Sequence, residues 1–339
     1  VDFRSAFPPT QTVVSEQMES SSHPYAELSP VAVLEAVESL GYETDARMFP
    51  LNSYENRVYQ VGLAGKPSII VKFYRPERWT TQQILEEHSY TQELVDLEIP
   101  VVPPIDYQQG GTLQQFNNFR FSVFEQFLGR PPELDNLDNL LVMGRFVGRI
   151  HAVGALHEFK HRIELTAERF AVQSRQYLLE NDFLSRDMRP AYETVSQDLV
   201  DKIQQRFAAH GEVQKLRIHG DCHPGNVLWK DETPNFVDFD DTMTGPAIQD
   251  LWMMLSGDRN QRQAQLLELV EGYNEFHHFR ASELELVESM RTMRLMNYAA
   301  WLARRWEDPA FPKSFPWFNT ERYWAEHIQE LREQLFLLD

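Results

Sequence analysis

The chain has 339 residues, of which 42% are hydrophobic, and its 32 Lys and Arg against 51 Asp and Glu give a formal net charge of −19. This length and apolar content predict one two-lobed domain or two domains with a sizeable core, and exclude a largely disordered chain. The negative charge disfavours binding to nucleic acid or anionic membranes, and no stretch reaches the ~18 consecutive apolar residues of a membrane span. The single cysteine, Cys222, excludes an intrachain disulfide, and no signal-peptide pattern is seen, so we expect a cytoplasmic protein.

The first segment, residues 1–28, is predicted to be a flexible extension because it is rich in serine and proline and lacks apolar periodicity. A helix should follow, since Ser29 and Pro30 have the form of an N-cap and a first helical residue. Its apolar face ends at Gly41, which is typical of a helix stop.

Strand patterns then dominate, and we predict a small, β-rich, nucleotide-binding lobe over residues 29–126. One helix interrupts the strands: Thr80 to Gln83 has the form of a capping box and opens a helix that reaches about Leu97. The predicted strands are Tyr54 to Val61, Ser68 to Phe73, Thr112 to Gln115 and Phe119 to Phe127.

From residue 127 to 339 amphipathic helical patterns prevail, so this part is predicted to be a larger helical lobe that carries catalysis and substrate binding. The fold class expected is therefore α+β, with two lobes as in protein kinases and a ligand cleft between them. The helical patterns cover about 137–151, 166–180, 191–210 and 261–306, and short apolar runs at 226–229 and 236–239 separate them.

Two polar clusters flank these short apolar runs. His219-Gly-Asp221 is followed by Asn226, and Asp238 comes directly after Phe236-Val237. A hairpin turning at residues 230–234 would bring Asp221, Asn226 and Asp238 to one site. Phosphoryl transfer from Mg-ATP needs such a set, in which Asp221 takes the proton of the acceptor hydroxyl while Asn226 and Asp238 hold Mg²⁺. The spacing H-G-D-x(4)-N followed by a hydrophobic-D parallels the kinase catalytic loop and its metal-binding aspartate.

Two other interpretations of these residues are open. Asp221 and Asn226 could only cap turns, but Asp238 and Asp240 would then carry uncompensated charge beside apolar residues. His219, Asp221 and His223 could form a transition-metal site, although that explains neither Asn226 nor the second acidic cluster. We expect His219 to brace the loop and His223 to lie near the substrate.

The nucleotide side requires a strand lysine and a helical carboxylate. Ser68-Ile-Ile-Val-Lys72-Phe places Lys72 in a form close to V-A-I-K. Helical angles put Glu87, and not Glu86, on the apolar side of its helix, so Glu87 is predicted to pair with Lys72.

A glycine-rich phosphate loop is absent, and Leu51-Asn-Ser-Tyr-Glu-Asn-Arg-Val58 stands in its place. Ser53 and neighbouring backbone N–H groups could bind phosphate there. Chain order places the adenine near Phe124, Glu125 and Phe127, where the lobes join.

In its H-G-D form the catalytic loop resembles that of the aminoglycoside phosphotransferase and choline kinase group. Over roughly residues 30 to 320 the chain resembles the bacterial stress response kinase A family. The segments that carry this resemblance are Leu51 to Tyr59, Val71 to Trp79, Ile84 to His88, His219 to His223, Asp250 to Trp252, and Arg304 to Pro312 with Trp317.

The resemblance implies a cytoplasmic serine/threonine protein kinase of the stress response with an aminoglycoside phosphotransferase-like fold, using ATP and Mg²⁺ and acting as a monomer. It implies Asp221 as proton acceptor, Asn226 and Asp238 as Mg²⁺ ligands, and Ser53 at the ATP site. The substrate would be a protein hydroxyl, with autophosphorylation as one option.

The acceptor and activity remain open from chemistry alone. A small-molecule kinase acting on an alcohol or amino sugar would use the same loop, and a pseudokinase would bind nucleotide without catalysis. The pseudokinase is disfavoured because the whole site set is present. A basic concentration near the C-terminus either balances neighbouring glutamates or lines the acceptor side of the cleft; its members are Arg291, Arg294, Arg304, Arg305 and Lys313.

Overall fold

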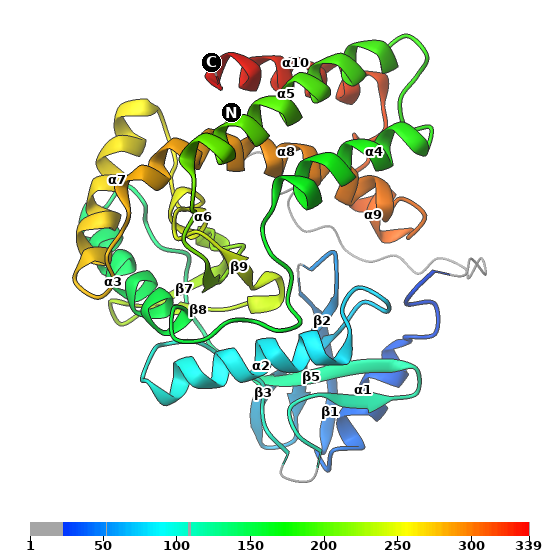
Figure 1. Cartoon of the computed structure of the whole chain (residues 1–339). Helices are drawn as coiled ribbons and strands as arrows, with labels where there is room; N and C mark the ends of the chain where they lie inside the picture. Colours follow the sequence, from blue (N-terminus) through cyan, green and yellow to red (C-terminus); the bar gives the residue numbers. More distant parts are fainter. Residues whose placement is uncertain (1–22, 52, 108–109, 339) are drawn as a thin grey trace.

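The computed structural model describes residues 23–51, 53–107 and 110–338, which form a sheet-based N-lobe and a helical C-lobe (Figure 1). Within these residues no helix is both long and apolar enough to cross a bilayer. The strands of the N-lobe come first along the chain and the helices of the C-lobe follow, as predicted.

The N-lobe is built on a five-stranded sheet in the order β1-β2-β3-β5-β4, with every neighbouring pair antiparallel. Lys72 of β3 lies opposite Val58 of β2 and Ser122 of β5, so it stands in the middle of the sheet. The strands are β1 (Thr44–Pro50), β2 (Arg57–Leu63), β3 (Lys66–Phe73), β4 (Gln114–Phe116) and β5 (Phe119–Glu125).

Two helices flank this sheet, and both begin as predicted. In α1 (Pro30–Glu38) the Ser29 hydroxyl accepts from the Ala32 N–H, and Val33 and Val37 are fully buried in the N-lobe core. α2 (Thr81–Asp96) opens with a complete capping box between Thr80 and Gln83. Such caps satisfy N–H groups that have no partner within the helix.

The sequence prediction missed three features of the chain. Tyr25 and Leu28 are buried in the N-lobe core, so the packed lobe starts before the predicted boundary at residue 29. Strand β1, whose residues alternate poorly, and helix α10 were not predicted. Residues 1–22 of the predicted flexible extension lie outside the described residues.

In the C-lobe, α3 and α7 pack closely because glycines lie at their contact: an added Cβ at Gly144 would stand 2.1 Å from the Leu269 carbonyl oxygen. The helical pattern predicted over 261–306 forms two helices in the structure, α7 and α8, and a short 3₁₀ segment precedes α8. The helices are α3 (Leu137–Gly154), α4 (Gln173–Glu180), α5 (Arg189–His210), α6 (Ile248–Trp252), α7 (Arg259–Asn274), α8 (Val287–Arg304), α9 (Ala310–Ser314) and α10 (Glu321–Leu337).

Two small antiparallel pairs lie on the side of the C-lobe that meets the N-lobe. Strand β6 (Leu216–Ile218) pairs with β9 (Met243–Gly245), and β7 (Val227–Lys230) pairs with β8 (Thr233–Phe236). The β7–β8 turn is Asp231-Glu232, with φ of 48° and 59°. Positive φ at both central residues suits the right-handed twist of a two-residue hairpin. The predicted hairpin is therefore confirmed.

Candidate active site

The β7–β8 hairpin joins the two polar clusters. The Val237 N–H donates to the Asn226 carbonyl oxygen at 3.0 Å, and Asn226 Nδ2 donates to the Asp221 carbonyl oxygen at 3.0 Å. Asp221, Asn226 and the residue before Asp238 are thus linked by hydrogen bonds. The convergence expected from the spacing is present.

Asp250 of α6 holds the loop before Asp221. This fully buried carboxylate accepts from the N–H of His219 at 2.8 Å and of Gly220 at 2.9 Å, and it lies 2.9 Å from His151 Nε2. Charge-assisted bonds of this kind are strong and fix geometry. This role of Asp250 was not predicted from the sequence. Its signal was an acidic residue within an apolar helix, which requires partners.

His219 is also structural, as expected. Its Nε2 lies 2.9 Å from the Val237 carbonyl oxygen, so that nitrogen is the donor, and its ring lies 4.4 Å from that of Phe239. His223 Nδ1 accepts from the Gly225 N–H. The alternative metal site of His219, Asp221 and His223 is not supported: the described part of the chain holds no group of three or more His, Cys, Asp or Glu that could bind a metal.

Asp221 has cationic surroundings. Arg294 Nη1 of α8 lies 2.9 Å from Asp221 Oδ1, and His223 Nε2 lies 3.6 Å from Oδ2. Burial alone would raise the pKa of Asp221, but Arg294, followed by His223 and His219, holds it below its usual value. The carboxylate is therefore ionised at neutral pH, the form that can accept a proton.

The prediction that Lys72 pairs with Glu87 is wrong. The buried Lys72 Nζ lies 2.9 Å from Asp238 Oδ1 and 3.1 Å from Asp240 Oδ1. Two carboxylates from the other lobe compensate the buried ammonium, while Glu87 has Arg162 as its ion-pair partner, with Nη1 3.9 Å from Oε2.

The choice of Glu87 over Glu86 as the inward residue of α2 is confirmed. Glu87 is 3% exposed, and burial, opposed by Lys72, raises its pKa to about 7. Glu86 instead accepts from three successive backbone N–H groups of the C-lobe, those of residues 160, 161 and 162, at 2.6 to 2.9 Å. This contact ties α2 to the C-lobe.

The two aspartates after β8 differ in environment. Asp238 has φ of 60° and a side chain that is 51% exposed, so it can face a ligand. Asp240 is buried; Arg78 and Asn56 Nδ2 both donate to its Oδ2. Although burial opposes it, Arg78, Lys72 and Arg162 hold the pKa of Asp240 well below its usual value. Asp240 is thus a structural ion-pair residue. Its partners Arg78 and Asn56 were not predicted from the sequence.

The donor chemistry fits a hard cation. Asp238 offers an exposed carboxylate, and because Asn226 Nδ2 is engaged by Asp221, the amide oxygen is the atom left to face a metal. Mg²⁺ is commonly held by one or two protein oxygens together with substrate phosphates. Asn226 and Asp238 would be those ligands.

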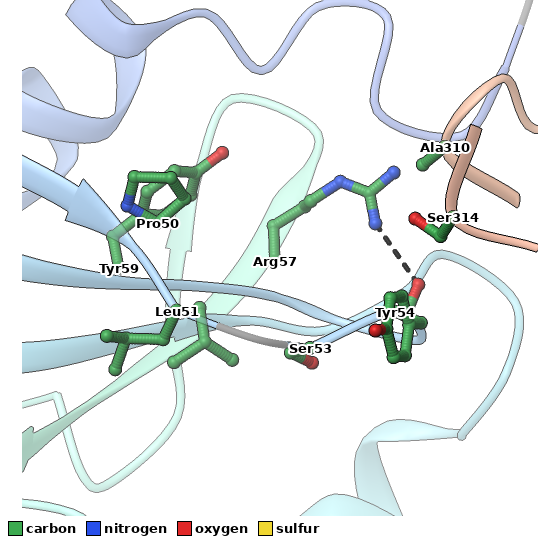
Figure 2. Close-up of a pocket in the computed structure, with 9 residues that line it drawn as sticks. Pro50, Leu51, Ser53, Tyr54, Arg57, Tyr59, Ala310 and Ser314 are labelled. Atoms are coloured by element: carbon green, nitrogen blue, oxygen red, sulfur yellow. Dashed lines mark hydrogen bonds between the residues drawn. The ribbon is translucent and has the colours of Figure 1, made fainter. Parts of the chain in front are cut away.

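Ser53 lies in a pocket between the β1–β2 turn and α9. Figure 2 shows Arg57 reaching from the start of β2 toward Ala310 and Ser314, and its Nη1 donates to the Tyr54 carbonyl oxygen at 3.2 Å. None of Lys72, Asp221, Asn226 or Asp238 lines this pocket, so it is distinct from the candidate catalytic residues. The assignment of Ser53 to phosphate binding stays a prediction.

The predicted adenine residues lie at the connection between the lobes. Glu125 is exposed at the end of β5, opposite Ile69 of β3. Phe127 is half-buried, with Lys230 Nζ 5.6 Å from its ring centre. Their position is consistent with chain order, and their contact with adenine stays a prediction.

The basic residues near the C-terminus contact different parts of the molecule. Arg294 contacts Asp221, whereas Arg305 is in the lobe interface with its Nε 2.6 Å from Glu55 Oε2. Arg304 donates to the Gln173 carbonyl oxygen within the C-lobe. Of the two alternatives left open by the sequence, charge balance holds for Arg305, because its guanidinium compensates a buried carboxylate.

Known proteins resemble the chain in sequence and fold. Residues 49–284 match the model of the phosphotransferase enzyme family. Stress response kinase A of Escherichia coli strain K12 is 41% identical over 321 residues, which cover 95% of this chain and 97% of that protein. The serine/threonine protein kinase RdoA of Salmonella typhimurium strain LT2 is 39% identical, with the same coverage.

Solved structures show the same architecture. An amicoumacin kinase in complex with AMP-PNP, Ca²⁺ and Ami has a TM-score of 0.71 at 19% identity and covers 89% of this chain and 92% of its own. A microcompartment-associated aminopropanol kinase has a TM-score of 0.68 at 17% identity, with 90% and 96% covered. The predicted two-lobed α+β phosphotransferase fold is confirmed.

Proposed function

Because the chain belongs to the phosphotransferase enzyme family and groups with the stress response kinase A proteins, we propose that this kinase is a serine/threonine protein kinase. It uses Mg-ATP, works in the cytoplasm as a monomer, and takes part in a stress response. The observation that carries the proposal is the joint position of Asp221, Asn226 and Asp238 on one hydrogen-bonded loop and hairpin.

Each residue has a part in the reaction. Asp221 orients the acceptor hydroxyl and takes its proton as the oxygen bonds to the γ-phosphorus and the bond to ADP breaks. Asn226 and Asp238 would hold Mg²⁺, which when bound would supply charge neutralisation at the phosphates. Lys72, already among carboxylates at the cleft, would contact the α- and β-phosphates.

The main alternative is a small-molecule kinase, as the amicoumacin and aminopropanol kinases of similar structure are named. Arg294 beside Asp221 disfavours one group of such acceptors: amino alcohols would bring an ammonium group close to a guanidinium. A protein acceptor is favoured by the relative at 39% identity that is named a serine/threonine protein kinase.

The test is incubation of the full chain with γ-labelled ATP and Mg²⁺, alone and with generic protein substrates. Label should enter a protein, or the kinase itself, with the Asp221→Asn variant as the inactive control. Turnover that occurs only with a small alcohol would contradict the protein-kinase assignment and support the alternative.

A further inference from the structure

The turn that replaces a glycine-rich loop is anchored on the C-lobe. This nucleotide turn, residues 53–56, has the Tyr54 ring 4.7 Å from that of Phe315. Glu55 Oε2 accepts from Trp301 Nε1 of α8 at 2.5 Å, and Asn56 Nδ2 donates to Asp240 Oδ2 at 3.0 Å. Three consecutive residues of the turn therefore contact the opposite lobe.

One C-lobe residue, Asp308, forms ion pairs with two arginines that themselves contact the turn. Its carboxylate is 2% exposed and lies 2.8 Å from Arg75 Nη1 and 3.3 Å from Arg57 Nη2. Arg57 Nη1 donates to the Tyr54 carbonyl oxygen, and the Arg75 N–H donates to Asn56 Oδ1 at 3.1 Å. The side chain of Arg57 and the backbone of Arg75 thus connect Asp308 to Tyr54 and Asn56 of the turn.

Asp308 is itself fixed in place. The Ala310 N–H donates to its Oδ1 at 3.1 Å and the Phe311 N–H to its carbonyl oxygen at 2.8 Å, at the start of α9. Phe311 is fully buried and lies under the Arg75 guanidinium, 5.6 Å from its ring centre. The carboxylate therefore has a defined position from which to hold both arginines.

This arrangement offers an alternative to a glycine-rich loop for fitting the backbone to phosphates. Residues 51–58 contain no glycine, so their backbone lacks the freedom to adapt around phosphates. A turn already held in its binding conformation loses little entropy when a ligand binds. Contacts from outside the turn would then set its affinity for the nucleotide.

We propose that Asp308 is a positioning residue for the nucleotide: by holding Arg57 and Arg75, it keeps the nucleotide turn in the conformation that binds the phosphates of Mg-ATP. The inference rests on the proposed function, because it takes Mg-ATP as the ligand. It assigns control of nucleotide affinity to a C-lobe residue near the end of the chain.

The test is calorimetric binding of Mg-AMP-PNP to the full chain and to the Asp308→Asn variant. We expect the variant to bind about tenfold more weakly, as is typical of coupling between two positions. Its KM for the acceptor at saturating ATP should be unchanged, and Asp308→Glu should restore part of the affinity.

The matched control is Glu283→Gln. Glu283 is also a fully buried C-lobe carboxylate, which accepts from the Ile248 N–H at 3.1 Å, away from the turn. It should lose stability without losing nucleotide affinity. Wild-type affinity in a folded Asp308→Asn variant would overturn the inference.

If Asp308→Asn does not fold, Arg57→Gln decides, because it removes one arm and leaves Asp308 paired with Arg75. A tenfold loss there supports the inference, and unchanged affinity rejects it. A wild-type chain that does not bind Mg-AMP-PNP would instead contradict the proposed function, and the inference would fail with it.

Discussion

Arg294 of α8 donates a hydrogen bond to Asp221, with Nη1 2.9 Å from Oδ1, although 73 residues separate the two in sequence. The Arg294 side chain is 46% exposed, so it stands at the open side of the loop. The half-exposed Arg294 guanidinium thus keeps the proposed base, Asp221, ionised.

The Arg294→Gln variant should shift the pH profile. Removal of the positive charge raises the pKa of Asp221, because Arg294 is the largest of the effects that lower it. The acid limb of kcat/KM should move to higher pH. The exposed Arg322→Gln change on α10 is the control; identical profiles for both variants would contradict the role of Arg294.

Asp221→Asn should abolish phosphoryl transfer while nucleotide affinity stays nearly unchanged, because in the proposed mechanism Asp221 faces the acceptor and not the nucleotide. Loss of a general base costs about 10²–10⁴-fold in rate. Turnover and Mg-AMP-PNP binding should be measured on the same preparation. A variant that keeps most of the wild-type rate shows that another group takes the proton.

Asp238→Ala and Asp240→Ala should separate binding from stability. The half-exposed Asp238 should be needed for Mg-ATP binding, with little change in the free energy of unfolding. Loss of the buried Asp240 leaves Arg78 without its main partner and should cost about 3–5 kcal/mol. Calorimetry and urea denaturation distinguish them, and wild-type Mg-ATP affinity in Asp238→Ala would move the metal to another carboxylate.

Arg305→Ala and Arg304→Ala should differ although the residues are adjacent. Arg305 compensates buried Glu55, so its loss should reduce stability by about 3 kcal/mol. Arg304 is exposed, and its loss should change stability by about 0.5 kcal/mol. Melting temperatures of the two single variants provide the measurement; equal values would mean that the contact with Glu55 contributes nothing.

The free energy of unfolding should decrease as the pH is lowered, because of His88. This buried ring lies between the Tyr74 hydroxyl, 2.7 Å from Nε2, and the Thr112 hydroxyl, 2.8 Å from Nδ1. Burial, with Lys72 and Arg162, lowers its pKa from 6.5 to about 3. A depressed histidine pKa stabilises the fold above the unfolded value of 6.5, and that contribution is lost as the pH falls toward 3.

The expected loss from His88 is about 1.4 kcal/mol per pH unit below 6.5. Urea denaturation at pH 7.5 and pH 5 should show it, and His88→Gln should reduce the difference between the two. Buried His327, whose pKa is lowered to about 4, remains in both proteins and contributes equally. An unchanged difference in His88→Gln would assign the pH dependence to other groups.

Local patterns in the sequence determined much of the chemistry. The caps at Ser29 and Thr80, the β7–β8 hairpin and the joint position of Asp221 and Asn226 depend on residues within a few positions of one another. Such features follow from backbone geometry, which the identity of neighbouring residues governs. The order of lobes followed from the change between strand and helix periodicity.

The tertiary structure alone decided which charges meet. Lys72 pairs with Asp238 across 166 positions and Arg75 with Asp308 across 233. The sequence alone favoured Glu87 for Lys72 and left two roles open for Arg305, which pairs with Glu55 in the structure. A buried charge needs a partner, but many residues could supply it. The partner is fixed only when the lobes pack and set the distances.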